Sequence, residues 1–231
     1  LVSVSGLWGI TFLVSWFASV VNWAWERAFN WKSCWGGIVV YAAVFGIIIA
    51  FGALRLNMAP APGESVSVAS FTAVEVQPEL LFPMVESDPD AFRAETRQTH
   101  QRYLDETVQS AAAGAQIVLW PELAGAGRVD DVERLLANGL SIAQETGIYL
   151  AMPTFSFYPG EERPGENILY VADLSGDIVL EHVKFGGNML EGSLLGNREL
   201  QTIRTPFGIL SGVICWDTDY PTVLQQAGRQ D

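Results

Sequence analysis

One cysteine stands where an apolar run gives way to polar residues. Cys215 follows Val213 and Ile214, and Pro221 then marks a turn and the start of a helix. The apolar run has the β-branched composition of a buried strand. A thiol at the end of such a strand faces the positive end of the next helix, so we expect it to lose its proton more easily than a thiol in water. The alternative is a structural role, because free cysteine is among the most buried residue types.

A carboxylate follows a second short apolar run. Glu122 comes directly after Trp120 and Pro121, at the end of a predicted strand over residues 116–120. The carboxyl ends of strands are where α/β sheets bind their ligands. The neighbouring indole and proline shield the carboxylate partly from water, which suits a general base. The alternative is a solvated glutamate in a loop.

Lys184 ends a third predicted strand and is followed by two glycines. It either extends to solvent or serves as a fixed cation that holds a thiolate and later the oxyanion of a tetrahedral intermediate. His182 lies on the same face of that strand, which makes a Cys–His pair an option. His100 falls in the middle of a predicted helix and is expected at the surface. Neither histidine has metal-ligand spacing, so neither a metal site nor a cofactor is predicted.

The elements that must position these residues follow the order of an α/β sandwich. Alternation predicts a strand over residues 65–76, and helical periodicity predicts helices over residues 90–113 and from Val132 to a stop at Gly147. On the inward face of the first helix we place Phe92, Thr99, Tyr103, Val108 and Ala111. A strand at residues 149–157 follows, then hairpins over 167–173 with 178–184 and over 200–204 with 209–214. This order predicts mixed sheets in an α/β sandwich.

The first 56 residues are almost uniformly apolar. Residues 1–25 and 33–54 contain no charged side chain, and each run is long enough to cross a bilayer as a helix. We predict transmembrane helices over residues 3–21 and 35–54. Arg27 and Lys32, against Glu26, place the connecting loop in the cytoplasm and the rest of the chain on the outer side.

The predicted organisation is a membrane region over residues 1–56, a linker over 57–64 and a catalytic domain over 65–231. The missing initial Met and the end at Asp231 lead us to expect a fragment truncated at its C-terminus. The net charge of −13 argues against nucleic acid as a partner. Cys34 and Cys215 lie in different predicted regions, so no disulfide framework is expected.

Three of these motifs together resemble a known family. Trp120-Pro121-Glu122, then Lys184, then Cys215 with an acid two residues on, are similar to the Glu–Lys–Cys triad of the nitrilase (carbon–nitrogen hydrolase) superfamily. The resemblance implies a nitrilase-like α-β-β-α sandwich, incomplete in this chain. The membrane prefix is similar to that of the apolipoprotein N-acyltransferases, the membrane enzymes that N-acylate bacterial lipoproteins; the matching residues are Gly6-Leu7-Trp8-Gly9, Phe12-Leu13 and Asn22.

The resemblance implies a role for each residue. Glu122 would take the proton of Cys215, which would attack the acyl ester of a phospholipid and form a thioester. Lys184 and the backbone N–H of Trp216 would stabilise the oxyanion. Glu191 matches the family's additional acid and would orient Lys184, with a plain loop acid as the alternative.

The implied acceptor is the N-terminal amine of a diacylglyceryl-lipoprotein. The implied location is the bacterial inner membrane, in a multi-pass protein with its catalytic domain on the periplasmic side. The implied partners are a phospholipid donor, the lipoprotein acceptor and the membrane, with no nucleic acid and no metal.

The chain departs from that family at two places. The family's His-Leu-x-Pro-Phe-Gly-Glu run after the lysine reads Phe185-Gly186-Gly187-Asn188-Met189-Leu190-Glu191, and its Cys-Tyr-Glu reads Cys215-Trp216-Asp217. These departures leave donor and acceptor preference open. Two alternatives therefore stand: a membrane-anchored amidase or nitrilase that passes the thioester to water, and a non-catalytic membrane protein that keeps the sandwich as a binding or scaffold module.

Overall fold

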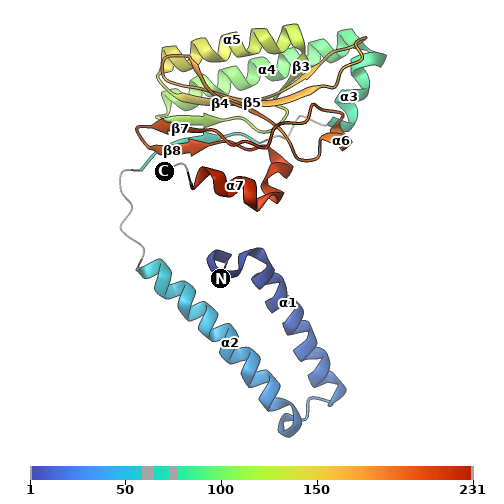
Figure 1. Cartoon of the computed structure of the whole chain (residues 1–231), viewed down its shortest axis with the longest axis vertical. Coiled ribbons are helices and arrows are strands. Elements are labelled where there is room, and N and C mark those ends of the chain that lie inside the picture. Colours follow the sequence, from blue (N-terminus) through green and yellow to red (C-terminus); the bar gives the residue numbers. More distant parts are fainter. Residues whose placement is uncertain (1, 59–64, 73–77, 230–231) are drawn as a thin grey trace. The chain divides into compact units, whose positions relative to one another are not determined.

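The computed structural model describes residues 2–58, 65–72 and 78–229 of the chain. The chain folds as two compact units, Leu1–Gly63 and Glu64–Asp231 (Figure 1).

The first unit is a pair of helices, α1 (Val2–Glu26) and α2 (Trp31–Asn57). Both extend beyond the helices predicted over residues 3–21 and 35–54, and α1 is interrupted at Gly6, whose φ is 61°. The Tyr41 hydroxyl donates to the Leu13 carbonyl at 3.5 Å, and the Tyr41 ring packs edge-on against Trp16. Both helices are long and apolar enough to cross a membrane, and few of their residues are buried within the chain.

The predicted linker and first strand lie partly outside the described residues. Asn57 is still helical and Met58 caps α2, whereas residues 59–64 of the predicted linker are not among those described. Of the strand predicted over residues 65–76, the structure assigns β1 to Val68–Ser70. Residues 73–77 fall outside the described part of the chain.

The second unit is built on a mixed sheet, in which β1 pairs with β2 (Ile117–Leu119) and β2 with β4 (Tyr149–Phe157), all parallel. The antiparallel strands β5 (Glu166–Ala172) and β6 (Ile178–Val183) continue the sheet beyond β4. The sequence did not predict β3 (Gly125–Arg128), which pairs with the second half of β4 after β2 has paired with the first half. The turn between β2 and β3 carries Glu122, so this carboxylate lies at an interruption within the sheet.

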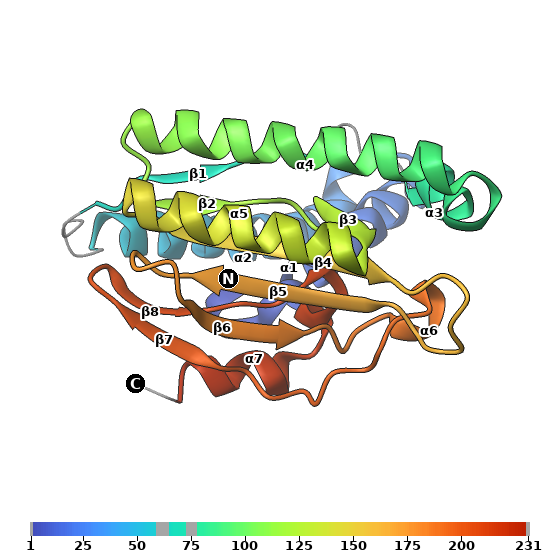
Figure 2. The same cartoon turned by 90° about the horizontal axis from the view of Figure 1, so that it is seen from above.

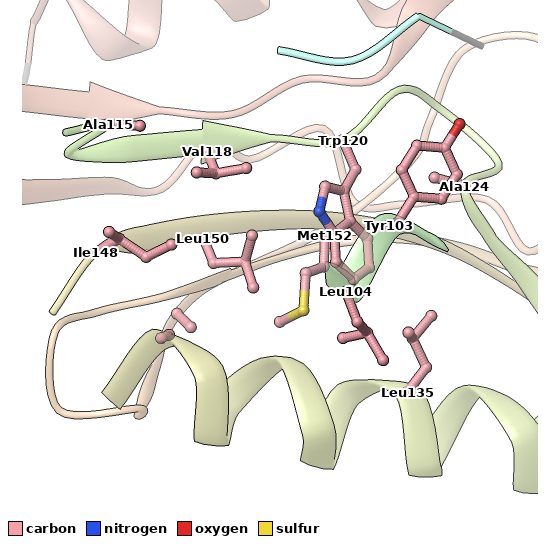
Figure 3. Packing of buried hydrophobic residues seen from close by; sticks show 12 residues of the cluster. Tyr103, Leu104, Ala115, Val118, Trp120, Ala124, Leu135, Ile148, Leu150 and Met152 are labelled. Carbon is pink, nitrogen blue, oxygen red and sulfur yellow. The ribbon is translucent and has the colours of Figure 1, made fainter. Parts of the chain in front are cut away.

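Helices α4 (Pro89–Ala112) and α5 (Val129–Thr146) run side by side over one face of the sheet (Figures 1 and 2). Gly147 ends α5 in the left-handed conformation, as predicted. A short helix that the sequence did not predict, α3 (Pro78–Ser87), precedes them. Figure 3 shows the core between helices and sheet, a hydrophobic cluster that includes Trp120, Met152 and Leu135. The Trp120 indole donates to the Thr107 hydroxyl at 2.8 Å, so this core also fixes the start of the Glu122 turn.

The opposite face of the sheet packs against the end of the chain. Ile214 lies in a core cluster with Leu169 and Leu180. The second hairpin forms a separate two-stranded sheet of β7 (Thr202–Thr205) and β8 (Gly208–Ser211), shorter than predicted. A 3-10 turn, η1 (Cys215–Asp219), and helix α7 (Pro221–Ala227) follow. The α/β sandwich predicted from the sequence is confirmed.

Two predictions about the first long helix of this unit are wrong. His100 is buried, and its Nε2 lies 2.9 Å from the Ala126 carbonyl oxygen. Burial, helped by the charge of Arg134 and opposed by that hydrogen bond, lowers the pKa of His100 to about 4. Val108, expected inside, is exposed. Phe92 and Tyr103 are buried as predicted, but hydrophobicity alone missed the polar residues of the buried stripe. The stripe comprises Phe92, Thr96, His100, Tyr103, Leu104 and Thr107.

Candidate active site

Lys184 lies at the centre of a buried cluster of charged groups. It follows β6, and its backbone N–H donates to the Asn167 carbonyl at 3.0 Å. Its side chain is fully buried; its Nζ donates to Glu122 Oε1 at 2.8 Å and forms an ion pair with Glu191 Oε1. The cation therefore does not extend to solvent. Glu191 ends the short helix α6 (Asn188–Glu191), absent from the predicted elements, and contacts Lys184 as the family resemblance implied.

Asn167 joins the two carboxylates and was missed at the sequence level. Its Nδ2 donates to Glu122 Oε1 at 3.1 Å and to Glu191 Oε2 at 3.3 Å, and the residue is fully buried. An amide at the start of an otherwise apolar strand was the available signal, because a buried polar side chain must find hydrogen-bond partners. Asn167 thus holds both acids against the same cation.

The charges in this cluster raise the pKa of Lys184. Burial acts to lower it, but the hydrogen bonds and charges of Glu122 and Glu191 outweigh burial. The side chain remains an ammonium ion at neutral pH.

Cys215 lies differently from the sequence prediction. Strand β8 ends at Ser211, and Cys215 opens the one-turn helix η1 with an exposed side chain and a φ of 46°. The predicted loss of its proton is wrong, because the pKa of the thiol is raised. Partial desolvation of the sulfur is the largest cause, although the residue as a whole is exposed, and the influence of Glu122 follows; Lys184 and the Trp216 N–H act in the opposite direction.

Glu122 is therefore the group that acts on both the Cys215 thiol and the Lys184 cation. It accepts a hydrogen bond from the Lys184 ammonium, and its charge raises the pKa of the Cys215 thiol. Its side chain keeps 29% exposure, which matches the partial shielding predicted. If the thiol hands its proton to this carboxylate, the negative charge moves to the sulfur, on which the Lys184 cation acts.

A second buried cluster is centred on Asp217. Its Oδ1 accepts from the N–H groups of Phe185 at 3.0 Å and Gly186 at 2.7 Å. Its Oδ2 accepts from Ile214 N at 3.0 Å and lies 2.8 Å from His182 Nε2. Burial alone would raise the pKa of Asp217, but these hydrogen bonds hold it below the usual value. His182 thus bonds to Asp217 and does not form the Cys–His pair considered from the sequence.

A cavity of about 410 Å³ lies beside Trp216. The indole of Trp216 is partly exposed, and α6 turns Met189 and Leu190 outward, with Met189 99% exposed. The lining is mostly apolar and consists of Phe185, Gly187, Asn188, Met189, Leu190, Leu195, Arg198, Trp216, Asp219 and Tyr220. Within the described residues, no group of three or more His, Cys, Asp or Glu side chains is placed to hold a metal ion.

Comparison with known proteins assigns the fold and the family. Residues 85–231, more than half of the chain, match the carbon–nitrogen hydrolase family. The chain belongs to the carbon–nitrogen hydrolases of the nitrilase superfamily. No curated protein sequence matches it.

Two solved structures share the fold at low sequence identity. An amidase from Nesterenkonia sp. is 19% identical with a TM-score of 0.52, the match covering 74% of this chain and 63% of the amidase. A cysteine-to-alanine mutant of the Nesterenkonia AN1 amidase from the nitrilase superfamily is also 19% identical, with a TM-score of 0.51 and coverage of 73% and 63%. This chain therefore spans less than two thirds of the length of those amidases.

Proposed function

We propose that this protein is a membrane-bound N-acyltransferase of the apolipoprotein N-acyltransferase type. It moves a fatty acyl chain from a phospholipid, through a thioester on Cys215, to the N-terminal amine of a lipoprotein. One observation carries the proposal: Glu122 accepts a hydrogen bond from the fully buried Lys184, and the charge of the same carboxylate raises the pKa of the Cys215 thiol. A base and a cation that both act on one sulfur are what acyl transfer through cysteine requires.

In the first half-reaction Glu122 takes the proton of Cys215, and the sulfur attacks the carbonyl carbon of the acyl ester. The oxyanion of the tetrahedral intermediate is stabilised by the Lys184 ammonium and by the backbone N–H of Trp216. As the intermediate collapses, the C–O bond breaks and the leaving alcohol takes the proton from Glu122. The products are the thioester and a lysophospholipid.

In the second half-reaction the amine of the acceptor attacks the thioester carbon. Glu122 removes a proton from the attacking nitrogen, and Lys184 again faces the oxyanion. The C–S bond then breaks, and Cys215 recovers the proton from Glu122. The amide product leaves an enzyme in its starting protonation state.

Two features favour lipid as the acyl donor. The cavity beside Trp216 has a mostly apolar lining, and Met189 and Leu190 expose their side chains at it. Long helices such as α1 and α2 that leave apolar side chains exposed require an apolar solvent. We place both helices in the bacterial inner membrane, with the second unit on the periplasmic side, as the basic residues of the connecting loop favour.

A membrane-anchored amidase is the second candidate, supported by the amidase fold that the chain shares. One variant of the Nesterenkonia amidase, matched at a TM-score of 0.50, carries the acetamide moiety of fluoroacetamide on its active-site cysteine. In an amidase, water takes the place of the amine and hydrolyses the thioester. Both candidates use the same residues, and they differ in the acceptor.

The test is to incubate the full chain with phospholipid labelled in its acyl chain, with and without a diacylglyceryl lipopeptide. We expect labelled acyl-enzyme in the unmodified protein and in Cys34→Ala, and no label above background in Cys215→Ala. Transfer of label to the lipopeptide amine supports the transferase, whereas release only as free fatty acid supports a hydrolase. Acyl-enzyme formation by Cys215→Ala at the normal rate would rule the mechanism out.

A further inference from the structure

We propose that His182 and Asp217 form a positioning pair that holds the nucleophile turn against the segment carrying the catalytic lysine. Neither side chain reaches the reacting atoms in this scheme. Both act by holding the backbone of the segments that carry Lys184 and Cys215. The inference rests on Cys215 being the nucleophile of the proposed function.

The Asp217 carboxylate bonds to the chain on both sides of the site. Through Oδ1 it accepts from Phe185 N and Gly186 N, the two residues directly after Lys184. Through Oδ2 it accepts from Ile214 N, directly before Cys215. A single buried side chain therefore joins two segments about 30 residues apart, as the separations of 32 and 31 positions show.

The two segments also touch at the level of the backbone. A Cβ added at Gly186 would lie 2.7 Å from the Trp216 carbonyl carbon, and one at Gly187 would overlap the Trp216 ring. Contacts this close leave no room for a side chain at either glycine. The distance between the lysine segment and the cysteine turn is thus set by direct packing. The hydrogen bonds of the Asp217 carboxylate hold the two segments in this contact.

The nucleophile turn needs such support because its backbone is strained. Cys215 has a φ of 46°, in the left-handed region that costs a non-glycine residue on the order of 1–3 kcal/mol. Strained residues persist where surrounding interactions determine their conformation. The bond from Ile214 N to Asp217 spans this turn. The conformation of this turn determines the direction of the Trp216 N–H, which is the group proposed to bind the oxyanion.

His182 completes the set of donors around the carboxylate. An ionised carboxylate only accepts hydrogen bonds, so the proton lies on Nε2 of the histidine. With His182 in place, each oxygen of Asp217 accepts two hydrogen bonds. His182 is 4% exposed and the Asp217 side chain is fully buried, so water cannot replace a lost donor without rearrangement. Removing the imidazole leaves Oδ2 with the bond to Ile214 alone.

The expected kinetic effect follows from this arrangement. A displaced Trp216 N–H weakens stabilisation of the oxyanion, which exists only in the transition state and intermediates, so kcat falls while KM changes little. The same N–H lowers the pKa of the Cys215 thiol. Its displacement should therefore move the pH midpoint of thiol alkylation upward, an effect that lost stability alone would not produce.

The experiment uses the full chain in detergent with Cys34→Ala throughout, so that iodoacetamide reports Cys215 alone. His182→Leu removes the donor, His182→Gln restores an N–H near the position of Nε2, and Asp217→Asn keeps the shape of the acid without its charge. Thr154→Val is the matched control, because it removes a buried 3.1 Å hydrogen bond to the Ile168 carbonyl in the same unit. Alkylation rate against pH, kcat, KM and Tm are measured for each.

We expect His182→Leu and Asp217→Asn to lower kcat about 10- to 100-fold with KM within about twofold, and to raise the alkylation midpoint. His182→Gln should restore most of kcat and most of the normal alkylation midpoint. Thr154→Val should lower Tm only. If either pair variant keeps the alkylation profile and kcat of the unmodified protein, the inference is overturned. If Cys215 resists alkylation in every variant and no acyl-enzyme forms, the proposed function itself fails.

Discussion

The candidate site contains one charged cluster around Lys184 and another around Asp217, and the two are opposite in design. In one, the Lys184 cation lies between Glu122 and Glu191, whose side chains keep 29% and 27% exposure. In the other, Asp217 is fully buried and accepts four hydrogen bonds, from His182 and from three backbone N–H groups. The first keeps acidic groups within reach of a substrate. The second leaves no lone pair of the carboxylate open.

We propose that this difference separates the groups that react from the groups that only hold the structure in place. A catalytic acid or base must change its bonding during the reaction, so it needs partial access and a partner whose charge stabilises each state. A structural ion works best when all its hydrogen bonds are satisfied and water is excluded. Glu122 meets the first description and Asp217 the second, although each is an acid near the same cysteine.

The largest effect is expected from Lys184→Met, which breaks the first cluster. The variant removes the cation and leaves Glu122 and Glu191 facing each other, so acyl-enzyme formation should fall about 1,000-fold or more. Loss of the buried partner should also cost about 3 kcal/mol of stability. Single-turnover acylation and urea unfolding measure the two effects. Activity within tenfold of the unmodified protein would remove Lys184 from the mechanism.

The next comparison is between the two acids of that cluster. Glu122→Gln removes the base, so acylation should fall about 100- to 10,000-fold. Glu191→Gln keeps an oxygen that accepts from Lys184, so we expect a loss of only about tenfold. Acylation rates of the two variants, measured side by side, give the ratio. Equal losses of acylation rate would contradict the assignment of Glu122 as the base. They would indicate that the two acids have the same role, which is to stabilise the Lys184 cation.

The smallest effect concerns His100, a buried group outside both clusters that is kept neutral. Its pKa is about 4 in the folded unit against an ordinary value of 6.5. Protons therefore bind the unfolded chain more readily, and stability should fall as pH drops through 6.5, by roughly 3 kcal/mol at pH 4. At pH 7 the group makes no such contribution.

His100→Gln tests that expectation, because the amide can still bond to the Ala126 carbonyl and does not titrate. Urea unfolding at pH 7 and at pH 4.5 should show a smaller loss of stability for the variant than for the unmodified protein. Parallel losses would show that other groups set the acid sensitivity of this unit.

Much of the fold was readable from local patterns. The strand over residues 149–157 and the stop of α5 at Gly147 agree with the structure, because apolar runs and a left-handed glycine are local signals. Strand β3 was not predicted, because the composition of Gly125–Arg128 does not favour a strand. Its pairing with β4 makes this segment a strand. Helix α6 is four residues long and gives no periodic signal.

The members of the candidate site were proposed from the sequence, but only part of their arrangement could be. The sequence by itself determined that a cysteine, a lysine and a glutamate stand at the ends of separate apolar runs, because residue type and position along a strand are local properties. Tertiary structure alone decided that the thiol keeps its proton, that His182 serves Asp217, and that Asn167 joins the two acids. Charge and hydrogen bonding depend on distances between residues far apart in the chain, and folding sets those distances.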